Sequence, residues 1–251
     1  MGQLPNPPAV SLADAEFRYK NAVETILDAY DALRRRPPHD QVNPRQLDAA
    51  VRRFLALSTH VEREKSGQPR TVDPADISHE GEYGITLLMD LGDWARRLQL
   101  DELEHEFDVI ALAFADWVVR HGGELRAIEP VVDALANLAN DERDRATLEH
   151  LTHLAIRIIR STAAPARTGA GRTYPNQPWR MLNLNNGIVA TRTHNPALME
   201  QAFDELARNL PDEAPRFFAE GMRQMEKFDF PLSVRAVMAR YFDRWTRPRM
   251  H

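Results

Sequence analysis

The chain has 251 residues, 43% hydrophobic and 27% charged, with a formal net charge of −5. This mildly acidic balance argues against a general affinity for nucleic acid or anionic lipid. The absence of cysteine excludes disulfides, thiolate metal sites and cysteine nucleophiles. Residues 1–10 show no signal-peptide pattern, and no apolar run approaches the ~18 residues of a membrane span. We therefore expect a cytoplasmic protein with no membrane contact.

Nearly all basic residues are arginine, since lysine occurs only at Lys20, Lys65 and Lys227. The simplest interpretation is a GC-rich bacterial genome. The functional alternative is planar ion-pair recognition, which arginine performs better than lysine.

Apolar residues recur at steps of three and four along the chain, which predicts an all-α fold. The first stripe contains Tyr19, Val23 and Ile26, and the clearest contains Phe107, Ile110 and Phe114. Short links between helices favour antiparallel neighbours. We expect about ten helices, at residues 11–36, 43–65, 80–99, 102–121, 129–140, 143–160, 179–193, 196–209, 212–227 and 231–246.

Helix boundaries are marked by pairs of a capping residue and proline, since proline is well tolerated at the first helical position. These pairs are Asn43-Pro44, Asp73-Pro74 and Asn195-Pro196. Gln46 lies three residues after Asn43, as in a capping box, and Ser11 with Asp14 is a weaker copy. His121-Gly122-Gly123 is typical of a helix C-terminus.

Two stretches, residues 66–78 and 161–178, interrupt the helical pattern with proline, glycine and polar residues. Long loops without secondary structure are uncommon in compact domains, so the second stretch is a candidate functional loop. It divides the chain into a helical region at residues 1–160 and a pair of helical hairpins at residues 179–251. One continuous domain is the alternative.

The last third of the chain shows a repeat of helical-hairpin length. Pro196 and Pro231 open helices 35 residues apart, close to the ~34 residues of a tetratricopeptide unit. Ala202, Phe203, Leu206 and Pro211 match the second half of that repeat, whereas its Trp-x-x-Leu-Gly-x-x-Tyr half is missing. Residues 179–246 thus resemble a degenerate tetratricopeptide-like array. The resemblance implies stacked antiparallel hairpins in an α-α superhelix, with a groove that binds a peptide or protein.

An amide-rich segment opens this region. Trp179, Arg180, Asn183 and Asn186 follow a proline-rich stretch, and the last three recur at spacings of three on one helix. Amide and guanidinium groups suit the recognition of a peptide backbone or carboxylate. The alternative interpretation is a helix start that Trp179 anchors by packing. We predict partner binding by these four residues.

A metal site is the alternative for a different set of residues. Glu102 and His105 share a helix face, as in the Glu-x-x-His motifs of di-iron bundles, but a second motif is missing. His150 and His153 form a second pair at a spacing of three. The structural interpretation is a stabilised helix N-terminus and two surface histidines.

The leading hypothesis is a non-enzymatic helical-repeat scaffold that binds a protein or peptide without a cofactor. The alternative is a metal-binding helical-bundle enzyme that uses Glu102, His105, His150 and His153. Binding of nucleic acid is a third interpretation, against which the net charge argues. The aromatic residues Phe228, Phe230, Tyr241 and Trp245 form either the terminal cap of the stack or the seam of a homodimer. A terminal repeat needs a polar outer face, so these residues favour the homodimer.

Overall fold

The computed structural model describes residues 11–33, 42–63, 72–168 and 177–246. These residues form eleven α-helices and one short 3-10 helix, which confirms the all-α prediction. Their one β-type contact is an isolated parallel bridge between Leu125 and Thr162. Within the same ranges, no helix combines the length and the apolar character that crossing a bilayer requires.

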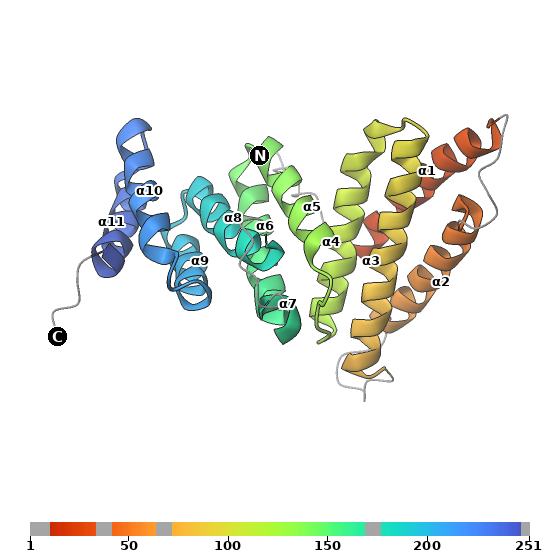
Figure 1. Ribbon diagram of the computed structural model, residues 1–251, viewed down its shortest axis with the longest axis horizontal. Coiled ribbons are helices and arrows are strands. Elements are labelled where there is room, and N and C mark those ends of the chain that lie inside the picture. The colour runs from red at the N-terminus through yellow and green to blue at the C-terminus, as the bar shows by residue number, and fades with distance from the viewer. Residues whose placement is uncertain (1–10, 34–41, 64–71, 169–176, 247–251) are drawn as a thin grey trace, which may run out of the picture. The chain divides into compact units, whose positions relative to one another are not determined.

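The helices are coloured in chain order in Figure 1. In chain order they are α1 (Leu12–Asp31), α2 (Pro44–Glu62), α3 (Pro74–Arg97), η1 (Asp101–Leu103), α4 (Glu104–Arg120), α5 (Glu129–Asp141), α6 (Arg145–Ser161), α7 (Ala164–Thr168), α8 (Pro178–Thr193), α9 (Pro196–Asn209), α10 (Ala214–Lys227) and α11 (Leu232–Thr246).

Three predicted boundaries need correction. The helix expected from residue 80 begins at Pro74, because Asp73 caps it by accepting a hydrogen bond from the Ala75 N–H at 2.8 Å. The helix expected from residue 102 begins with the 3-10 turn η1. The predicted loop at residues 161–178 contains α7. Residues 34–36 and 64–65 of the helices predicted at 11–36 and 43–65 lie outside the described residues, and so do residues 66–71 and 169–176 of the two predicted breaks.

The described residues group into two compact units. Of the described residues, 11–33, 42–63, 72–138 and 161–168 belong to the N-terminal unit, and 139–160 and 177–246 belong to the C-terminal unit. Residues 139–160 thus group with the C-terminal helices, and the division into domains at residues 161–178 stays a prediction.

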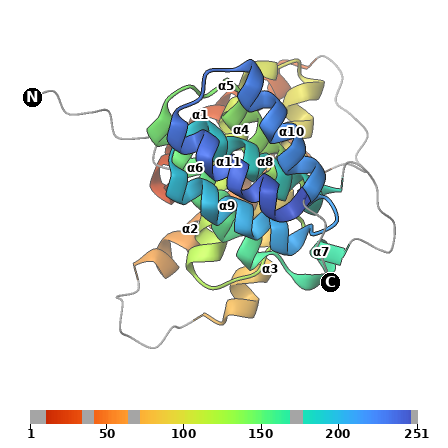
Figure 2. The ribbon, with the colours of Figure 1, turned by 90° about the vertical axis from the view of Figure 1, so that its left-hand side faces the viewer.

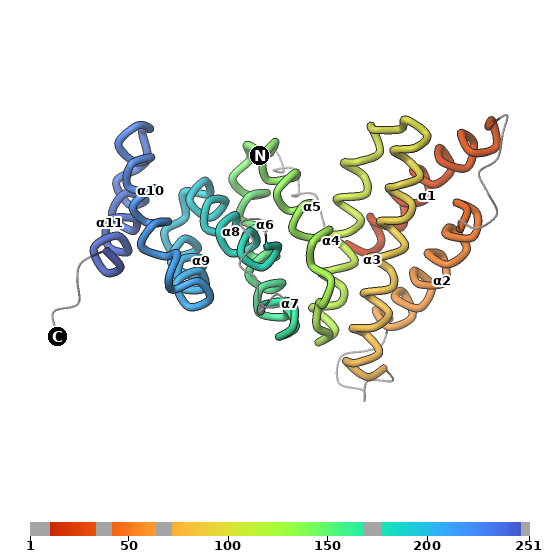
Figure 3. The backbone as a smooth tube through the Cα atoms, in the orientation of Figure 1, coloured from red at the N-terminus to blue at the C-terminus, as the bar shows by residue number. Residues whose placement is uncertain are grey.

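The N-terminal unit is built around a four-helix bundle. Helix α1 packs against α2 and α4, and α3 packs against the same two helices (Figure 3). The predicted apolar stripes supply the core, since Tyr19, Phe54 and Trp117 are fully buried. Phe54 meets Phe114 with a ring-centroid distance of 4.5 Å and Trp117 edge-on at 5.5 Å. Such aromatic contacts stabilise the bundle beyond the area they bury.

The C-terminal unit holds two helical hairpins, α8–α9 and α10–α11, and α11 also packs on α9 (Figure 2). An aromatic cluster joins them, because Phe203 of α9 contacts Phe218 of α10 and Tyr241 of α11 at centroid distances of 5.2 Å. Glycine permits the close approach of α8 and α10. A Cβ atom on Gly187 would lie 2.7 Å from Phe217 Cζ.

Candidate functional site

The predicted partner-binding residues lie mostly inside the C-terminal unit. Trp179, Asn183 and Asn186 are buried on α8. The amide of Asn183 donates to the Trp179 carbonyl at 2.9 Å and accepts from Asn209 Nδ2 at 2.8 Å. The side-chain amide nitrogen Nδ2 and oxygen Oδ1 of Asn186 both lack a hydrogen-bond partner among the described residues. These amides therefore do not face solvent in this conformation.

Arg180 is the one of these four residues that is not buried, and its side chain is 22% exposed. Its guanidinium donates from Nε to both carboxylate oxygens of Glu213, at 2.6 and 2.7 Å. The ion pair ties the start of α8 to the residue that precedes α10. A role of these four residues in binding stays a prediction, and the structure gives Arg180 an internal partner.

The residues of the metal alternative are divided between the two units. Glu102 and His105 belong to the N-terminal unit, and both are exposed. His150 and His153 belong to the C-terminal unit, where His153 is exposed and His150 is half-buried. Across the described parts of the chain, no group of three or more histidine or carboxylate residues is arranged to hold a metal ion. The metal hypothesis stays an untested prediction.

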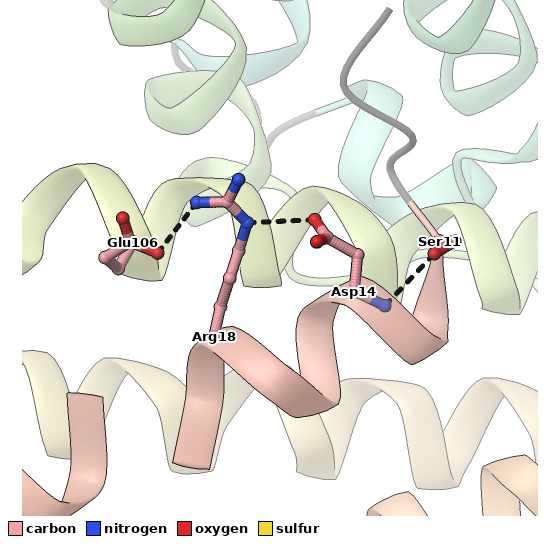
Figure 4. A network of polar contacts seen from close by, with 4 residues as sticks. All are labelled: Ser11, Asp14, Arg18 and Glu106. Atoms are coloured by element: carbon pink, nitrogen blue, oxygen red, sulfur yellow. Dashed lines mark hydrogen bonds and ion pairs between the residues drawn. The ribbon is translucent and has the colours of Figure 1, made fainter. Parts of the chain in front are cut away.

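The start of α1 is fixed by a polar network (Figure 4). Ser11 Oγ accepts a hydrogen bond from the Asp14 N–H at 3.1 Å, which confirms the predicted cap. The Asp14 carboxylate does not turn back to Ser11 but accepts from Arg18 Nε at 2.8 Å. Arg18 also donates from Nη1 to Glu106 of α4 at 2.8 Å. The first turns of α1 are thereby held against α4.

A groove runs along α1 and α2, which we call the α1–α2 groove. It consists of two hollows of about 420 and 560 Å³ that share Ala13 and Glu16. The first is also lined by Phe17, Tyr19, Lys20, Arg52, Leu55 and Ala56. The second is also lined by Ser11, Leu12, Thr59, Glu62, Arg63, Asp116 and Arg120. The groove therefore extends from the middle of α1 to the C-terminal end of α4.

Charges of both signs line the α1–α2 groove, with basic residues at each end and Glu16 between them. Arg120 donates from Nε to Asp116 and also pairs through Nη2 with Glu62, both at 2.7 Å. Burial lowers the pKa of this guanidinium, but the hydrogen bonds to Glu62 and Asp116 raise it by more, so the net shift is upward. Arg120 stays charged and fixes the two carboxylates.

Phe17 is the unusual residue of the groove because its side chain is 67% exposed. It lies off the buried stripe of α1, on the side that faces the hollow. Beside it, burial and then Asp48 raise the pKa of Tyr19, whose hydroxyl donates to Asp48 at 3.0 Å. Tyr19 is therefore a neutral hydrogen-bond donor rather than a nucleophile. The described groove offers contacts and charges but pairs no nucleophile with a base.

A third hollow of about 480 Å³, which we call the apolar pocket, lies in the C-terminal unit. It is lined by Ile188, Thr191 and Arg192 of α8, by Phe217, Glu220, Gly221, Gln224 and Met225 of α10, by Phe228 and Phe230 of the following link, and by Met238 of α11. Most of these side chains are apolar, which is typical of surfaces that bind proteins or apolar ligands.

Neither the α1–α2 groove nor the apolar pocket was predicted from the sequence. A detectable signal was present at Phe17, an aromatic residue outside the helical stripe, and at Phe228, which was singled out for self-association. Comparison with known proteins adds no constraint: no family model, curated protein or solved structure matches this chain.

Proposed function

We propose that this protein is a non-enzymatic helical scaffold that binds a helical segment of a partner protein in the α1–α2 groove. The observation that carries the proposal is a pair of adjoining hollows, lined by charges of both signs, with an exposed aromatic side chain on the wall of one of them. Exposed aromatic residues next to a concave surface are frequent sources of binding energy. Helix-in-groove recognition uses this combination of apolar anchor and flanking charges.

The dimensions of the groove favour a short helix. Its α1 wall runs from Ser11 to Lys20, which corresponds to about 14 Å at 1.5 Å per residue. A partner helix of two to three turns spans that length. Ala13 and Ala56 are both exposed, and their small side chains leave room for an incoming backbone.

The unpaired charges of the groove indicate how a partner would be oriented. Lys20 at one end and Arg63 at the other have no ion pair with any residue that the structure describes, and neither has Glu16 between them. A helix with acidic residues near both ends and a basic residue at its centre complements this order. Such complementarity selects the partner and its direction.

The tetratricopeptide-like character of residues 179–246 is part of the same proposal. It is supported by the hairpins α8–α9 and α10–α11 and by the burial of Ala202, Phe203 and Leu206, the residues that match the repeat. In this proposal the C-terminal hairpins are a structural array. A cytoplasmic location and the absence of a cofactor remain expectations of the proposed role.

Filling the groove tests the proposal. Ala56→Trp places a bulky side chain in the hollow at an exposed position, whereas Ala75→Trp places one at an exposed position of α3 outside the groove. Affinity purification of the full chain, quantified by mass spectrometry, should show a partner that is retained by wild type and Ala75→Trp and is depleted about tenfold by Ala56→Trp. Identical sets of proteins with all three baits would contradict the proposed site.

A further inference from the structure

The face that carries the apolar pocket presents a hollow and a projection side by side. The hollow of about 480 Å³ lies between α8 and the α10–α11 hairpin. Phe228, on its wall, is 59% exposed. Leu232 does not line the hollow but follows Phe228 by four residues, at the start of α11, and is 86% exposed. Exposed apolar side chains beside an apolar hollow are costly to leave in water.

We infer that this face is covered by a second copy of the chain. In a two-fold symmetric dimer both copies use the same surface patch. A projecting residue of the first copy that enters a hollow of the second copy is therefore matched by the same residue of the second copy in the hollow of the first. A surface with both a projection and a hollow satisfies this condition. Leu232 and Phe228 of each copy enter the apolar pocket of the other. The inference is independent of the α1–α2 groove and of its proposed partner.

The charges of the face suit self-association. The pocket wall carries one cation, Arg192, and one carboxylate, Glu220. Arg192 is held by the carbonyls of Ala139 and Glu142, to which Nη1 and Nη2 donate at 2.5 Å. Glu220 is held by Gln224, whose Nε2 donates to it at 2.7 Å, and by an ion pair with Arg223.

A two-fold axis allows Arg192 of one copy to face Glu220 of the other. A foreign partner with a strong charge of either sign would meet one of these two groups unfavourably, whereas a second copy supplies both. The balance of charge therefore favours a second copy over an acidic or a basic partner.

The size of the face sets the strength of the dimer. The eleven lining residues and Leu232 amount to about half of the 20–30 residues that each side of a standard interface contributes. We therefore expect a dimer that dissociates in the micromolar range rather than an obligate one.

Sedimentation velocity of the full chain, from about 1 to 200 µM, tests the inference directly. Wild type should shift from monomer to dimer across this range. Leu232→Asp and Ile188→Asp change a projecting residue and a pocket residue, both exposed, and each should weaken the dimer about tenfold or more. Met89→Asp alters a comparably exposed apolar residue of the N-terminal unit and should leave dimerisation unchanged.

Circular dichroism spectra that match wild type show that each variant is folded. A chain that stays monomeric at about 200 µM overturns the inference, and so does a dimer that Met89→Asp weakens as much as Leu232→Asp does. Binding of a fluorescent anilinonaphthalene dye is a further measurement. The inference is also overturned if wild type stays monomeric and enhances the fluorescence of the dye, and if Ile188→Asp abolishes this enhancement. That result would assign the pocket to an apolar ligand.

Discussion

Asn183 and Asn186 lie three residues apart on α8 and are both buried, yet only Asn183 has hydrogen-bond partners among the described residues. A buried amide without partners costs about 1–3 kcal/mol, and a buried amide with partners contributes to stability. Two similar side chains on one helix therefore have opposite effects on the free energy of unfolding.

Substitution by the near-isosteric leucine should reveal this difference. We expect Asn186→Leu to raise the free energy of unfolding by about 1 kcal/mol, because it removes the cost of an unsatisfied amide. We expect Asn183→Leu to lower it by about 2 kcal/mol, because it leaves Asn209 Nδ2 without the side-chain oxygen to which it donates. Urea unfolding of both variants is the measurement, and a loss of stability in Asn186→Leu would point to a satisfied amide.

Two glycines of α3 provide a matched pair for packing. A Cβ atom on Gly81 would lie 2.0 Å from Val118 Cγ2, a fully buried atom of α4, whereas one on Gly92 would meet nothing within 4 Å. At either site, replacing glycine by alanine stabilises the helix by about 1 kcal/mol through its higher helix propensity. Overpacking costs about 1–3 kcal/mol at Gly81 alone. Gly92→Ala should thus raise the midpoint of thermal unfolding, and Gly81→Ala should lower it. Equal shifts of the midpoint in the two variants would mean that α3 and α4 are not in close contact at Gly81.

Glu205 is a buried carboxylate with two arginine partners. It is 2% exposed and accepts from Arg160 Nε at 2.8 Å and Arg208 Nη1 at 2.9 Å. The arginine side chains are 60% and 64% exposed, so water can solvate them when the carboxylate is removed.

The consequence is an asymmetry between the partners. We expect Glu205→Leu to change the free energy of unfolding by less than about 1 kcal/mol, since a leucine replaces a buried ion that the protein had to desolvate. The double variant Arg160→Ala with Arg208→Ala should cost about 3–5 kcal/mol, because it leaves a buried charge unpaired. Chemical denaturation distinguishes the cases, and the reverse order of effects would contradict the burial of Glu205.

His194 gives the C-terminal unit a dependence on pH. Burial lowers its pKa below the ordinary value of 6.5, and Arg145 lowers it further. As the pH falls, the unfolded chain therefore binds a proton at this residue at a higher pH than the folded chain does. The contribution of His194 to the free energy of unfolding is fully present above about pH 6.5 and decreases as the pH falls below that value. His194 ends α8 at φ 58°, a conformation that asparagine tolerates.

We expect His194→Asn to flatten the change in unfolding midpoint between about pH 6.5 and pH 5. His153→Asn, at an exposed position of α6, is the control and should keep the wild-type slope. Thermal unfolding followed across that range is the measurement. A steeper loss of stability in His194→Asn would mean that the histidine gains, rather than loses, proton affinity on folding.

Local chemistry made the helices predictable. Capping interactions act within one turn of the chain, so residue type and spacing suffice to predict them. The capping box of Asn43 and Gln46 marks the start of α2, and the αL glycine Gly122 marks the end of α4. Helix α7 was missed because five residues are too few to show a helical period.

Burial on α8 was less predictable, because this helix lacks a clear apolar stripe. Polar residues such as Asn183 and Thr191 occupy its buried side, where they bond to backbone carbonyls or to neighbouring side chains. The α1–α2 groove depends on residues of α1, α2 and α4 that meet only in space. Glu16 and Arg120 line the same hollow but are 104 positions apart in the chain, and periodicity along a single helix does not predict that they share a hollow.

The most direct test of the proposed function places a photocrosslinking phenylalanine analogue at Phe17, in the α1–α2 groove, and separately at Tyr83, an exposed aromatic residue of α3 outside it. We predict that the chain labelled at position 17 forms one discrete covalent adduct with a partner protein in cells. We also predict that Ala56→Trp abolishes this adduct. Irradiation that gives the same products from positions 17 and 83, or an adduct at position 17 that Ala56→Trp leaves intact, would contradict the assignment of the groove as the binding site.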